Sequence, residues 1–391
     1  MRVRLRAPSR GRGGGRRGRR PGPGHGPGRR AVRLTGLRRA DGAEGRRGRV
    51  PFLPGAVRDA AAPGRVHSVN AILEPTSTSL RGRDFLSVAD LSAGEVGRLF
   101  ERAAELKAED RARREHGAPV ATPLAGRTLA MLFQKPSLRT RVTFEAGMNQ
   151  LGGHAVYLTE DVVMGARESV RDVARNLERF VDAIVARTGP HEVVVELAAQ
   201  ASVPVINGLT LREHPCQALA DVFTMRERFG DLRGRVLAFV GDGNNVYHSL
   251  ALLGSMLGVE VRLAHPAEYG PNPRIVAAAR ELGEGTEARL VFGDNPTEIV
   301  RGADVVYTDA WTSMGQEAET EARRDAFARF RVDEALMDAA GPDAVAMHCL
   351  PARRGEEITS GVMDGPRSVI WDQSENRLHV QKALLVEVLG G

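Results

Sequence analysis

The chain of 391 residues contains little cysteine and no long hydrophobic run. Its two cysteines, Cys216 and Cys349, are too few for a disulfide framework, and Cys-x-x-Cys or Cys/His spacing typical of metal sites is absent. We therefore expect a reducing, cytoplasmic location. A membrane-spanning helix needs about 18 consecutive apolar residues, whereas the longest apolar stretches here are short, such as residues 236–240. We accordingly expect no membrane partner.

Negative charge is scarce only at the start of the chain. Residues 1–50 hold 17 arginines, no lysine and two acidic residues. The formal net charge is +6, so the remaining residues carry a net charge of −9. The basic balance therefore belongs to the first segment, and it gives no reason to expect that the rest of the chain binds nucleic acid.

Residues 1–80 are rich in Arg, Gly and Pro and lack hydrophobic periodicity. Such a composition cannot bury enough apolar surface to offset chain entropy, so we expect a disordered extension. The segment has no apolar core of a signal peptide, and it is too rich in Gly and Pro for an amphipathic transit helix. We expect that this extension can be removed without loss of activity. The alternative is that it is an RNA-binding arm.

Beyond residue 85, apolar patterns of helical and strand length alternate. Ser92 and Glu95 have the spacing of a capping box, which predicts a helix starting there. Strand-length runs of Val, Ile, Leu and Ala are found at 128–133, 155–158, 183–186, 203–206, 236–240, 259–263, 289–292, 304–307, 344–347 and 368–371. The first four runs are apolar rather than alternating, as is typical of strands buried on both faces.

The alternation predicts the α/β class, with parallel sheets flanked by helices and right-handed crossovers. About four strands precede a long helix at 216–229 and about six follow it. We therefore expect two α/β domains, each with a central parallel sheet, dividing near residues 210–235. Ligands of such sheets bind at the carboxyl ends of the strands.

The loop after the first strand is basic and rich in hydroxyl groups. It contains Lys135, Ser137, Arg139, Thr140 and Arg141, just before a helical pattern. Backbone N–H groups at a helix N-terminus, together with guanidinium groups that bind two oxygens at once, form a site suited to phosphate. Taken alone, the loop could equally be a solvated basic turn.

A second segment, residues 213–221, leads into the long helix. His214 and Gln217 are three residues apart, so both face the same way in the first helical turn and can reach one carbonyl or amide group. A histidine that is purely structural is the alternative. A third segment, 239–246, resembles a dinucleotide fingerprint but has Val246 where the third glycine belongs. Its Asn244 and Asn245 could instead bind a carboxylate.

Two further polar segments, 309–317 and 348–357, directly follow strands. They place an acid, hydroxyl groups and a thiol in neighbouring loops, a combination that suits an amine-bearing substrate. Each alone could also be an ordinary loop with a buried cysteine.

Together these motifs resemble the ornithine carbamoyltransferases. The Ser-x-Arg-Thr-Arg loop and the His-Pro-x-Gln segment are shared with aspartate carbamoyltransferases, whereas Asp-x-Trp-x-Ser-Met-Gly-Gln-Glu and His-Cys-Leu-Pro are specific to the ornithine enzymes. The resemblance covers the chain from about residue 85 to its end. It implies a carbamoyl phosphate-binding domain at 81–220, completed by a C-terminal helix at 376–391, and an ornithine-binding domain at 221–375. It also implies a homotrimer or a multiple of trimers, with no metal and no organic cofactor.

The resemblance also implies roles for individual residues. Those expected to bind carbamoyl phosphate are Ser137, Leu138, Arg139, Thr140, Arg187, His214, Gln217, Cys349, Leu350 and Arg377. Those expected to bind ornithine are Asn245, Asp309, Ser313 and Met314. Within both sets, the residues expected to act in the reaction are Arg187, His214, Asp309 and Cys349. Leu138 departs from the usual threonine, so it offers a backbone N–H but no hydroxyl to the phosphate.

The expected activity is transfer of a carbamoyl group from carbamoyl phosphate to the side-chain amine of L-ornithine, in arginine biosynthesis or in the reverse direction. A carbamoyltransferase for another amine or amino acid, such as putrescine or aspartate, is the nearest alternative. An NAD-dependent oxidoreductase and a nucleic-acid-binding protein with an inactive body are more remote ones.

Overall fold

The computed structural model describes residues 79–119, 121–159, 168–312 and 317–391. The described residues belong to one compact unit. The disordered extension expected at 1–80 lies almost wholly outside them. Leu80 is buried in the core and the Gly82 N–H donates to the carbonyl oxygen of Val388, so the expected boundary at 80 is too late in the sequence. No helix among the described residues is long and apolar enough to cross a membrane.

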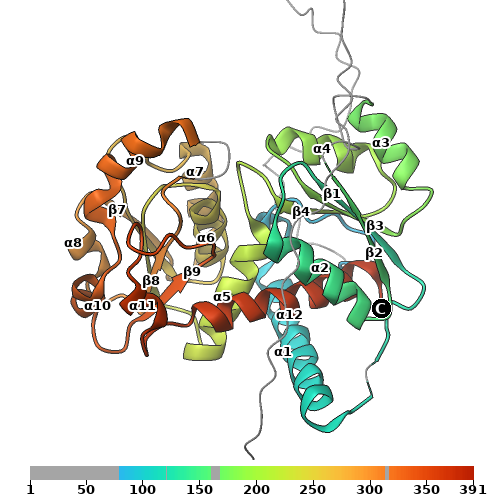
Figure 1. Ribbon diagram of the computed structural model, residues 1–391, viewed down its shortest axis with the longest axis horizontal. Coiled ribbons are helices and arrows are strands. Elements are labelled where there is room, and N and C mark those ends of the chain that lie inside the picture. Colours follow the sequence, from blue (N-terminus) through green and yellow to red (C-terminus); the bar gives the residue numbers. More distant parts are fainter. Residues whose placement is uncertain (1–78, 120, 160–167, 313–316) are drawn as a thin grey trace, which may run out of the picture. The chain divides into compact units, whose positions relative to one another are not determined.

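The first sheet is parallel throughout and has the strand order β2-β1-β3-β4. Its strands are β1 (Thr128–Phe133), β2 (His154–Leu158), β3 (Ala183–Arg187) and β4 (Val205–Leu209). The connecting helices are α2 (Leu138–Gln150), α3 (Val170–Leu177) and α4 (His191–Gln200). Figure 1 shows these elements together at the right of the molecule. The predicted strands are confirmed here, with β4 starting and ending later than expected.

The second sheet is also parallel, in the order β7-β6-β5-β8-β9. Its strands are β5 (Val236–Val240), β6 (Glu260–Ala264), β7 (Arg289–Gly293), β8 (Val305–Thr308) and β9 (Val345–His348). The helices around it are α6 (Asn245–Met256), α7 (Pro273–Leu282), α8 (Pro296–Val300), α9 (Thr320–Phe327), α10 (Glu334–Ala340) and α11 (Ser360–Asp364). Short 3₁₀ helices lie at Val88–Asp90, Glu317–Glu319 and Ala328–Phe330. The fold class predicted from the sequence, two parallel sheets flanked by helices, is confirmed.

The strand expected at 368–371 is wrong. Ser368 forms only an isolated bridge with Ala346, and helix α12 (Ile370–Leu389) begins immediately afterwards. A run with only three apolar residues, 369–371, fits a strand or a helical turn equally well, and packing decided for the helix. The C-terminal helix therefore starts six residues earlier than expected, which places Arg377 in its interior.

Three long helices connect the parts of the described chain. Helix α1 (Ala93–His116) starts at the predicted capping box, in which Ser92 and Glu95 each bond the other's backbone N–H. Helix α5 (Pro215–Phe229) confirms the predicted long helix. Helix α12, coloured red in Figure 1, packs against α1, α2, α5 and strand β9. One hydrophobic cluster accordingly includes residues of both sheets and of all three helices.

The central strands are buried as expected, but the edge strands β2 and β7 are not. Strands β1, β3, β5 and β8 have nearly every residue buried, whereas β2 and β7 contain only half-buried and exposed residues. Edge position alone does not decide this, because β4 and β9 also lie at sheet edges and are buried. The cover that a strand receives in the folded chain cannot be read from the composition of a run.

The strand orders place the functional loops together. In the first sheet the order reverses between β1 and β3, and in the second between β5 and β8. Crossover helices leave in opposite directions at such a point, which opens a crevice at the strand carboxyl ends. The loops after β1, β5 and β8 are among those whose polar residues the sequence analysis singled out, and Arg187 ends β3.

Candidate functional site

The basic loop after β1 ends in a capped helix N-terminus. Ser137 is the N-cap of α2, and its hydroxyl accepts the backbone N–H of Thr140 at 3.3 Å. Leu138, the first residue of the helix, has its side chain 73% exposed. Leu138 therefore offers a ligand its backbone N–H at the helix end, but its side chain supplies no hydroxyl group. The helix end offers the partial positive charge that favours an anion.

Two buried arginines converge on this helix end. Arg377, in α12, donates to the Thr140 hydroxyl at 2.8 Å, and Arg187, the last residue of β3, reaches the same oxygen at 3.5 Å. Their side chains are almost fully buried, and the Nε atom of each has no partner among the described residues. Arg139 is half-buried beside them.

The buried positive charges of these arginines favour the binding of an anion. Burial, followed by the positive charge of Arg377, lowers the pKa of Arg187 to about 10. Burial also lowers the pKa of Arg377 and Arg139, and each of these groups is affected by the charge of another arginine or of a nearby acid. Several buried like charges raise the free energy of the protein unless an anion compensates them. A dianion with several oxygens supplies that compensation through charge-assisted hydrogen bonds.

His214 lies at the start of α5, close to these arginines. It is the N-cap residue, and its backbone N–H donates to the Ser249 hydroxyl at 3.0 Å. Burial, together with the charges of Arg377 and Arg187, lowers the pKa of His214 well below its usual value. The imidazole is therefore neutral at pH 7. Its Nδ1 is buried and has no partner among the described residues, so the ring keeps hydrogen-bonding capacity for a ligand.

Gln217 follows in the first turn of α5 and is buried. Its amide nitrogen donates to Asp221 at 2.7 Å, whereas its amide oxygen has no partner among the described residues. His214 and Gln217 thus each present one buried, unsatisfied polar atom, as the pairing in the sequence suggested.

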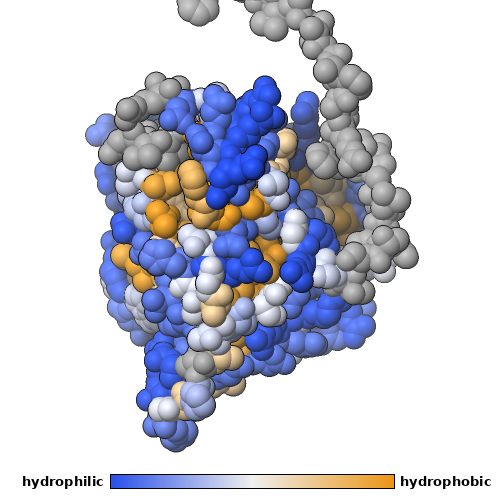
Figure 2. Space-filling view, turned by 90° about the vertical axis from the view of Figure 1, so that its right-hand side faces the viewer, coloured by the Kyte–Doolittle hydropathy of each residue, from blue (hydrophilic) through white to orange (hydrophobic). Residues whose placement is uncertain are grey.

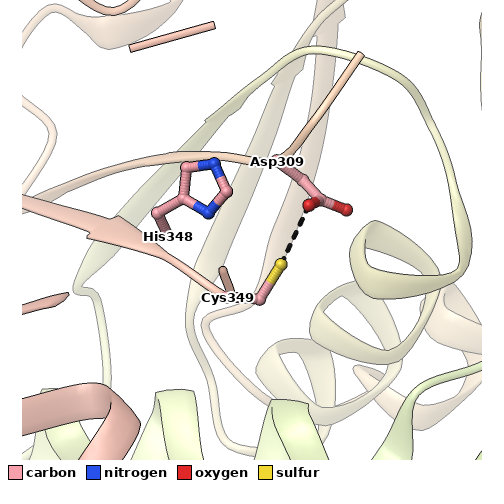
Figure 3. Close-up of side chains that lie close together, drawn as sticks. All are labelled: Asp309, His348 and Cys349. Carbon is pink, nitrogen blue, oxygen red and sulfur yellow. Dashed lines mark hydrogen bonds between the residues drawn. The ribbon is translucent and has the colours of Figure 1, made fainter. Parts of the chain in front are cut away.

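The second sheet contributes an acid and a thiol. Asp309 follows β8 and Cys349 follows β9, and the Cys349 thiol donates to Asp309 Oδ1 at 3.0 Å, as Figure 3 shows. Asp309 is also held by the Ala310 backbone N–H at 2.7 Å and by the Asn244 amide at 2.9 Å. Burial, followed by the negative charge of Asp309, raises the pKa of Cys349 well above its usual value. The thiol is therefore protonated at neutral pH.

The two groups of residues act on each other electrostatically. Burial lowers the pKa of the Arg139 guanidinium, and the negative charge of Asp309 opposes this lowering. The arginines at the α2 N-terminus thus lie near Asp309 and its hydrogen-bond partner Cys349.

One group of side chains has potential metal-ligand atoms close together. Among the described residues, Asp309, His348 and Cys349 have such atoms within 4.8 Å of one another (Figure 3). However, the Leu350 backbone N–H donates to His348 Nδ1 at 2.8 Å, which leaves the ring proton on Nε2, where it is donated to Glu357 at 3.1 Å. Both ring nitrogens are thus engaged, so this set does not fit a metal ion.

The comparisons with known proteins agree with this geometry. Residues 83–227 match the family profile described as aspartate/ornithine carbamoyltransferase, carbamoyl-P binding domain, and residues 233–388 match the corresponding Asp/Orn binding domain. The chain belongs to the aspartate/ornithine carbamoyltransferase family. Over 311 residues it is 50% identical to the ornithine carbamoyltransferase of Anoxybacillus flavithermus. The match covers 79% of this chain and 98% of that protein.

Solved structures of the family are also similar. The ornithine carbamoyltransferase from Pyrococcus furiosus is 48% identical, with a TM-score of 0.76, and the match covers 80% of this chain and 99% of the other. That from Thermus thermophilus is 44% identical, with a TM-score of 0.70, over 78% and 98% of the two chains.

The remaining family-derived residues have different surroundings. Asn245 donates to the carbonyl oxygen of Thr210 at 2.6 Å, and Leu350 is half-buried with φ +60°. Ser313 and Met314 lie outside the described residues. Arg141 is exposed; it stacks on the Tyr157 ring at 3.8 Å and pairs with Glu145 at 3.1 Å.

The glycines of the segment that resembles a dinucleotide fingerprint have another explanation. A Cβ atom on Gly243 would collide with the backbone of Pro271, so close chain packing requires glycine there. The following Asn244 caps helix α6 and holds Asp309, rather than remaining open to a ligand carboxylate.

Sequence analysis missed the partners of Gln217. Asp221 lies four residues later in the same helix, so helical spacing could have indicated it. Tyr307 and Gln373, which also contact Asp221, carry no comparable signal because they come from a distant strand and helix.

Proposed function

We propose that this protein transfers the carbamoyl group of carbamoyl phosphate to the side-chain amine of L-ornithine, giving L-citrulline and phosphate. The relatives whose sequences match this chain over nearly their whole length are named ornithine carbamoyltransferases. The observation that carries the proposal is the meeting of three arginines at a capped helix end with an acid and a thiol from the second sheet.

Carbamoyl phosphate binds at the α2 N-terminus. The backbone N–H groups at Leu138 and Arg139 and the hydroxyls of Ser137 and Thr140 contact the phosphate oxygens, with Arg139 and Arg377 neutralising its charge. In support, Arg377 already lies at hydrogen-bond distance from Thr140. Both arginines then hold the charge that grows on the phosphate as it leaves.

The carbamoyl group lies between Arg187, His214 and Gln217. Arg187 and the neutral His214 donate to the carbamoyl oxygen, and Gln217 accepts from its nitrogen. In other enzymes, one donor to a developing oxyanion contributes about 3 kcal/mol to the lowering of the barrier. The depressed pKa of His214 supports this role, because a neutral ring donates from one nitrogen without adding a further positive charge to the cluster.

Ornithine binds beside Asp309 and Cys349, with Asn245, Ser313 and Met314 contacting its amino-acid part and Leu350 lining the carbamoyl group. Reaction requires the neutral amine, whereas at pH 7 only about 1 in 2,500 alkyl ammonium groups is neutral. The amine proton goes to solvent or to the leaving phosphate. Cys349 is itself protonated and cannot take it, so positioning and charge stabilisation provide the rate enhancement.

The same proposal assigns the two substrates to two parts of the chain. Residues 81–220, completed by the helix at 376–391, bind carbamoyl phosphate, and 221–375 bind ornithine. The family profiles at 83–227 and 233–388 support a division into two substrate-binding parts, although the second profile includes the last helix. The packing of α12 on α1 and α2 supports the contribution of the last helix to the first site.

We also propose a cytoplasmic homotrimer, or a multiple of trimers. The edge strand β2 and helix α2 expose Leu138, Val142 and Val156, which favours a covering partner. Figure 2 looks onto the side on which β2 lies and shows hydrophobic side chains gathered among hydrophilic ones. A site that uses a protonated thiol, Cys349, fits a reducing compartment.

A direct assay tests the function. Purified protein given carbamoyl phosphate and L-ornithine is expected to form citrulline and inorganic phosphate in equal amounts. Aspartate and putrescine serve as matched acceptors, and neither is expected to yield product at a comparable rate. Absence of citrulline from folded protein, or a preference for another acceptor, would refute the proposal.

A further inference from the structure

Asp221 is a fully buried carboxylate behind Gln217. Its Oδ1 accepts the side-chain amides of Gln217 and Gln373, each at 2.7 Å, and its Oδ2 accepts the Tyr307 hydroxyl at 3.0 Å. These donors come from α5, α12 and β8, so three elements hold one carboxyl group.

This arrangement determines which way the Gln217 amide points. Burial raises the pKa of Asp221 to about 6, so the group is ionised at pH 7 and can only accept hydrogen bonds. The NH₂ end of Gln217 must therefore face Asp221. The amide oxygen is left at the other end, buried and without a partner among the described residues.

We propose that Asp221 is a positioning residue that fixes the Gln217 amide oxygen toward the substrate, and thereby makes the site select an acyl phosphate that carries NH₂ beside its carbonyl group. The inference deepens the proposed function and rests on its placement of Gln217 at the carbamoyl nitrogen. With Asp221 in place, the only group that satisfies the Gln217 oxygen is a hydrogen-bond donor.

Acetyl phosphate has nearly the same shape as carbamoyl phosphate, with CH₃ in place of NH₂. Its methyl group leaves the buried Gln217 oxygen unpaired, which a site built for a hydrogen bond penalises strongly. A Gln217 free to rotate would lose this discrimination, because it could turn its NH₂ group to the substrate and so stop favouring an N–H donor.

The surroundings of Asp221 keep it from rotating. Gln373 donates to it and at the same time accepts the backbone N–H of His348 at 2.9 Å. Since His348 precedes Cys349, the same network extends from Gln217 to the start of the loop that carries the thiol. Each amide in the network has only one orientation that satisfies its neighbours.

The test compares two ligands in matched variants. The Michaelis constant for carbamoyl phosphate and the competitive inhibition constant of acetyl phosphate are measured for the wild type, Asp221→Leu and Asp221→Asn. Leu removes both acceptor atoms, whereas Asn keeps Oδ1 for the two glutamines and can donate to Tyr307. Asp221→Ala is the second disrupting variant, and circular dichroism checks that each protein is folded.

We expect the wild type to bind carbamoyl phosphate at least tenfold more tightly than acetyl phosphate. In Asp221→Leu and Asp221→Ala, the Michaelis constant is expected to rise about tenfold with little change in acetyl phosphate inhibition, and Asp221→Asn is expected to keep the ratio within about twofold. A purely structural loss would weaken both ligands alike. An unchanged ratio in a folded disrupting variant, or equal weakening of both ligands, would overturn the proposal.

Gln217→Leu separates this inference from the function on which it rests. It is expected to bring the ratio of the acetyl phosphate inhibition constant to the carbamoyl phosphate Michaelis constant close to one, whatever the role of Asp221. If citrulline forms but Gln217→Leu keeps the wild-type ratio, the placement of Gln217 is wrong and the inference is overturned with it. If Gln217→Leu abolishes the ratio and the Asp221 variants keep it, only the role of Asp221 is refuted.

Discussion

Arg377 donates to the hydroxyl of Thr140 at 2.8 Å, across a separation of 237 residues in the sequence. The contact joins the last helix to the first turn of α2, and Arg187 reaches the same oxygen. One buried hydroxyl thus accepts from two guanidinium groups whose positive charges repel each other.

Thr140→Val tests that organisation. The substitution keeps the shape of the side chain but removes the oxygen, so the two arginines lose a shared partner. We expect the Michaelis constant for carbamoyl phosphate to rise at least tenfold, since tenfold corresponds to about 1.4 kcal/mol and a single hydrogen bond to a charged group contributes about 1.5–3 kcal/mol. The control is Thr143→Val, which removes a hydroxyl that bonds only backbone carbonyls of the same helix. Equal effects of both substitutions would argue against a role for Thr140 in the site.

Arg139→Ala is expected to lower kcat/KM for carbamoyl phosphate by about two to three orders of magnitude, because it removes a group that balances developing phosphate charge. Steady-state kinetics measures the effect, and thermal unfolding shows whether the fold is kept. The control is Arg111→Ala, which removes an exposed arginine that pairs with Glu115 on α1. Near-normal turnover of Arg139→Ala would remove this arginine from the mechanism.

Both cysteines are expected to react slowly with iodoacetamide in the native protein. Burial raises the pKa of Cys216 to about 12, and burial with the charge of Asp309 raises that of Cys349 well above its usual value. The thiolate is the reactive form, so at pH 8 both thiols are protonated and protected. Mass spectrometry should show alkylation of both only after unfolding. Alkylation of Cys349 in the native protein as fast as of free cysteine would contradict its protonated state.

Glu213 is expected to make stability depend on pH. Burial raises its pKa to about 7 in the folded protein, whereas an unperturbed glutamate titrates near 4.3. The native state therefore binds the proton more strongly, and this contribution to stability is complete at low pH and is lost as pH rises toward 7.

Chemical denaturation of wild type and Glu213→Gln at several pH values measures this contribution. From pH 4.5 to 7, the free energy of unfolding of the wild type should fall relative to the variant by about 3 kcal/mol. A difference that is constant with pH would show that the carboxyl group is not protonated in the folded state.

Removal of residues 1–78 is expected to leave kcat within about twofold, since no residue of the proposed site lies there. The truncation should end at 78, because Leu80 is part of the hydrophobic core. A full-length preparation is the control in the citrulline assay. A large loss of activity in a folded truncated protein would assign a role to the extension.

Local patterns determined most of the fold. The apolar run at β1 and β5 coincided with a buried strand, and the capping box at Ser92 marked the first turn of α1. The run at 368–371 was ambiguous, because its three apolar residues fit a strand or a helix, and the packing of α12 resolved it. The exposure of β2 and β7, in contrast to the buried edge strands β4 and β9, also depended on what covers each strand in the folded chain, which is not a local property.

The sequence by itself determined the residue types of the site, because helix starts and strand ends carry recognisable local patterns. Only the tertiary structure decided their relationships: which hydroxyl two arginines share, that His214 is neutral, and that Asp221 orients Gln217. The physical reason is that burial and contacts between distant segments set pKa values and hydrogen-bond directions, and neither exists until the chain has folded.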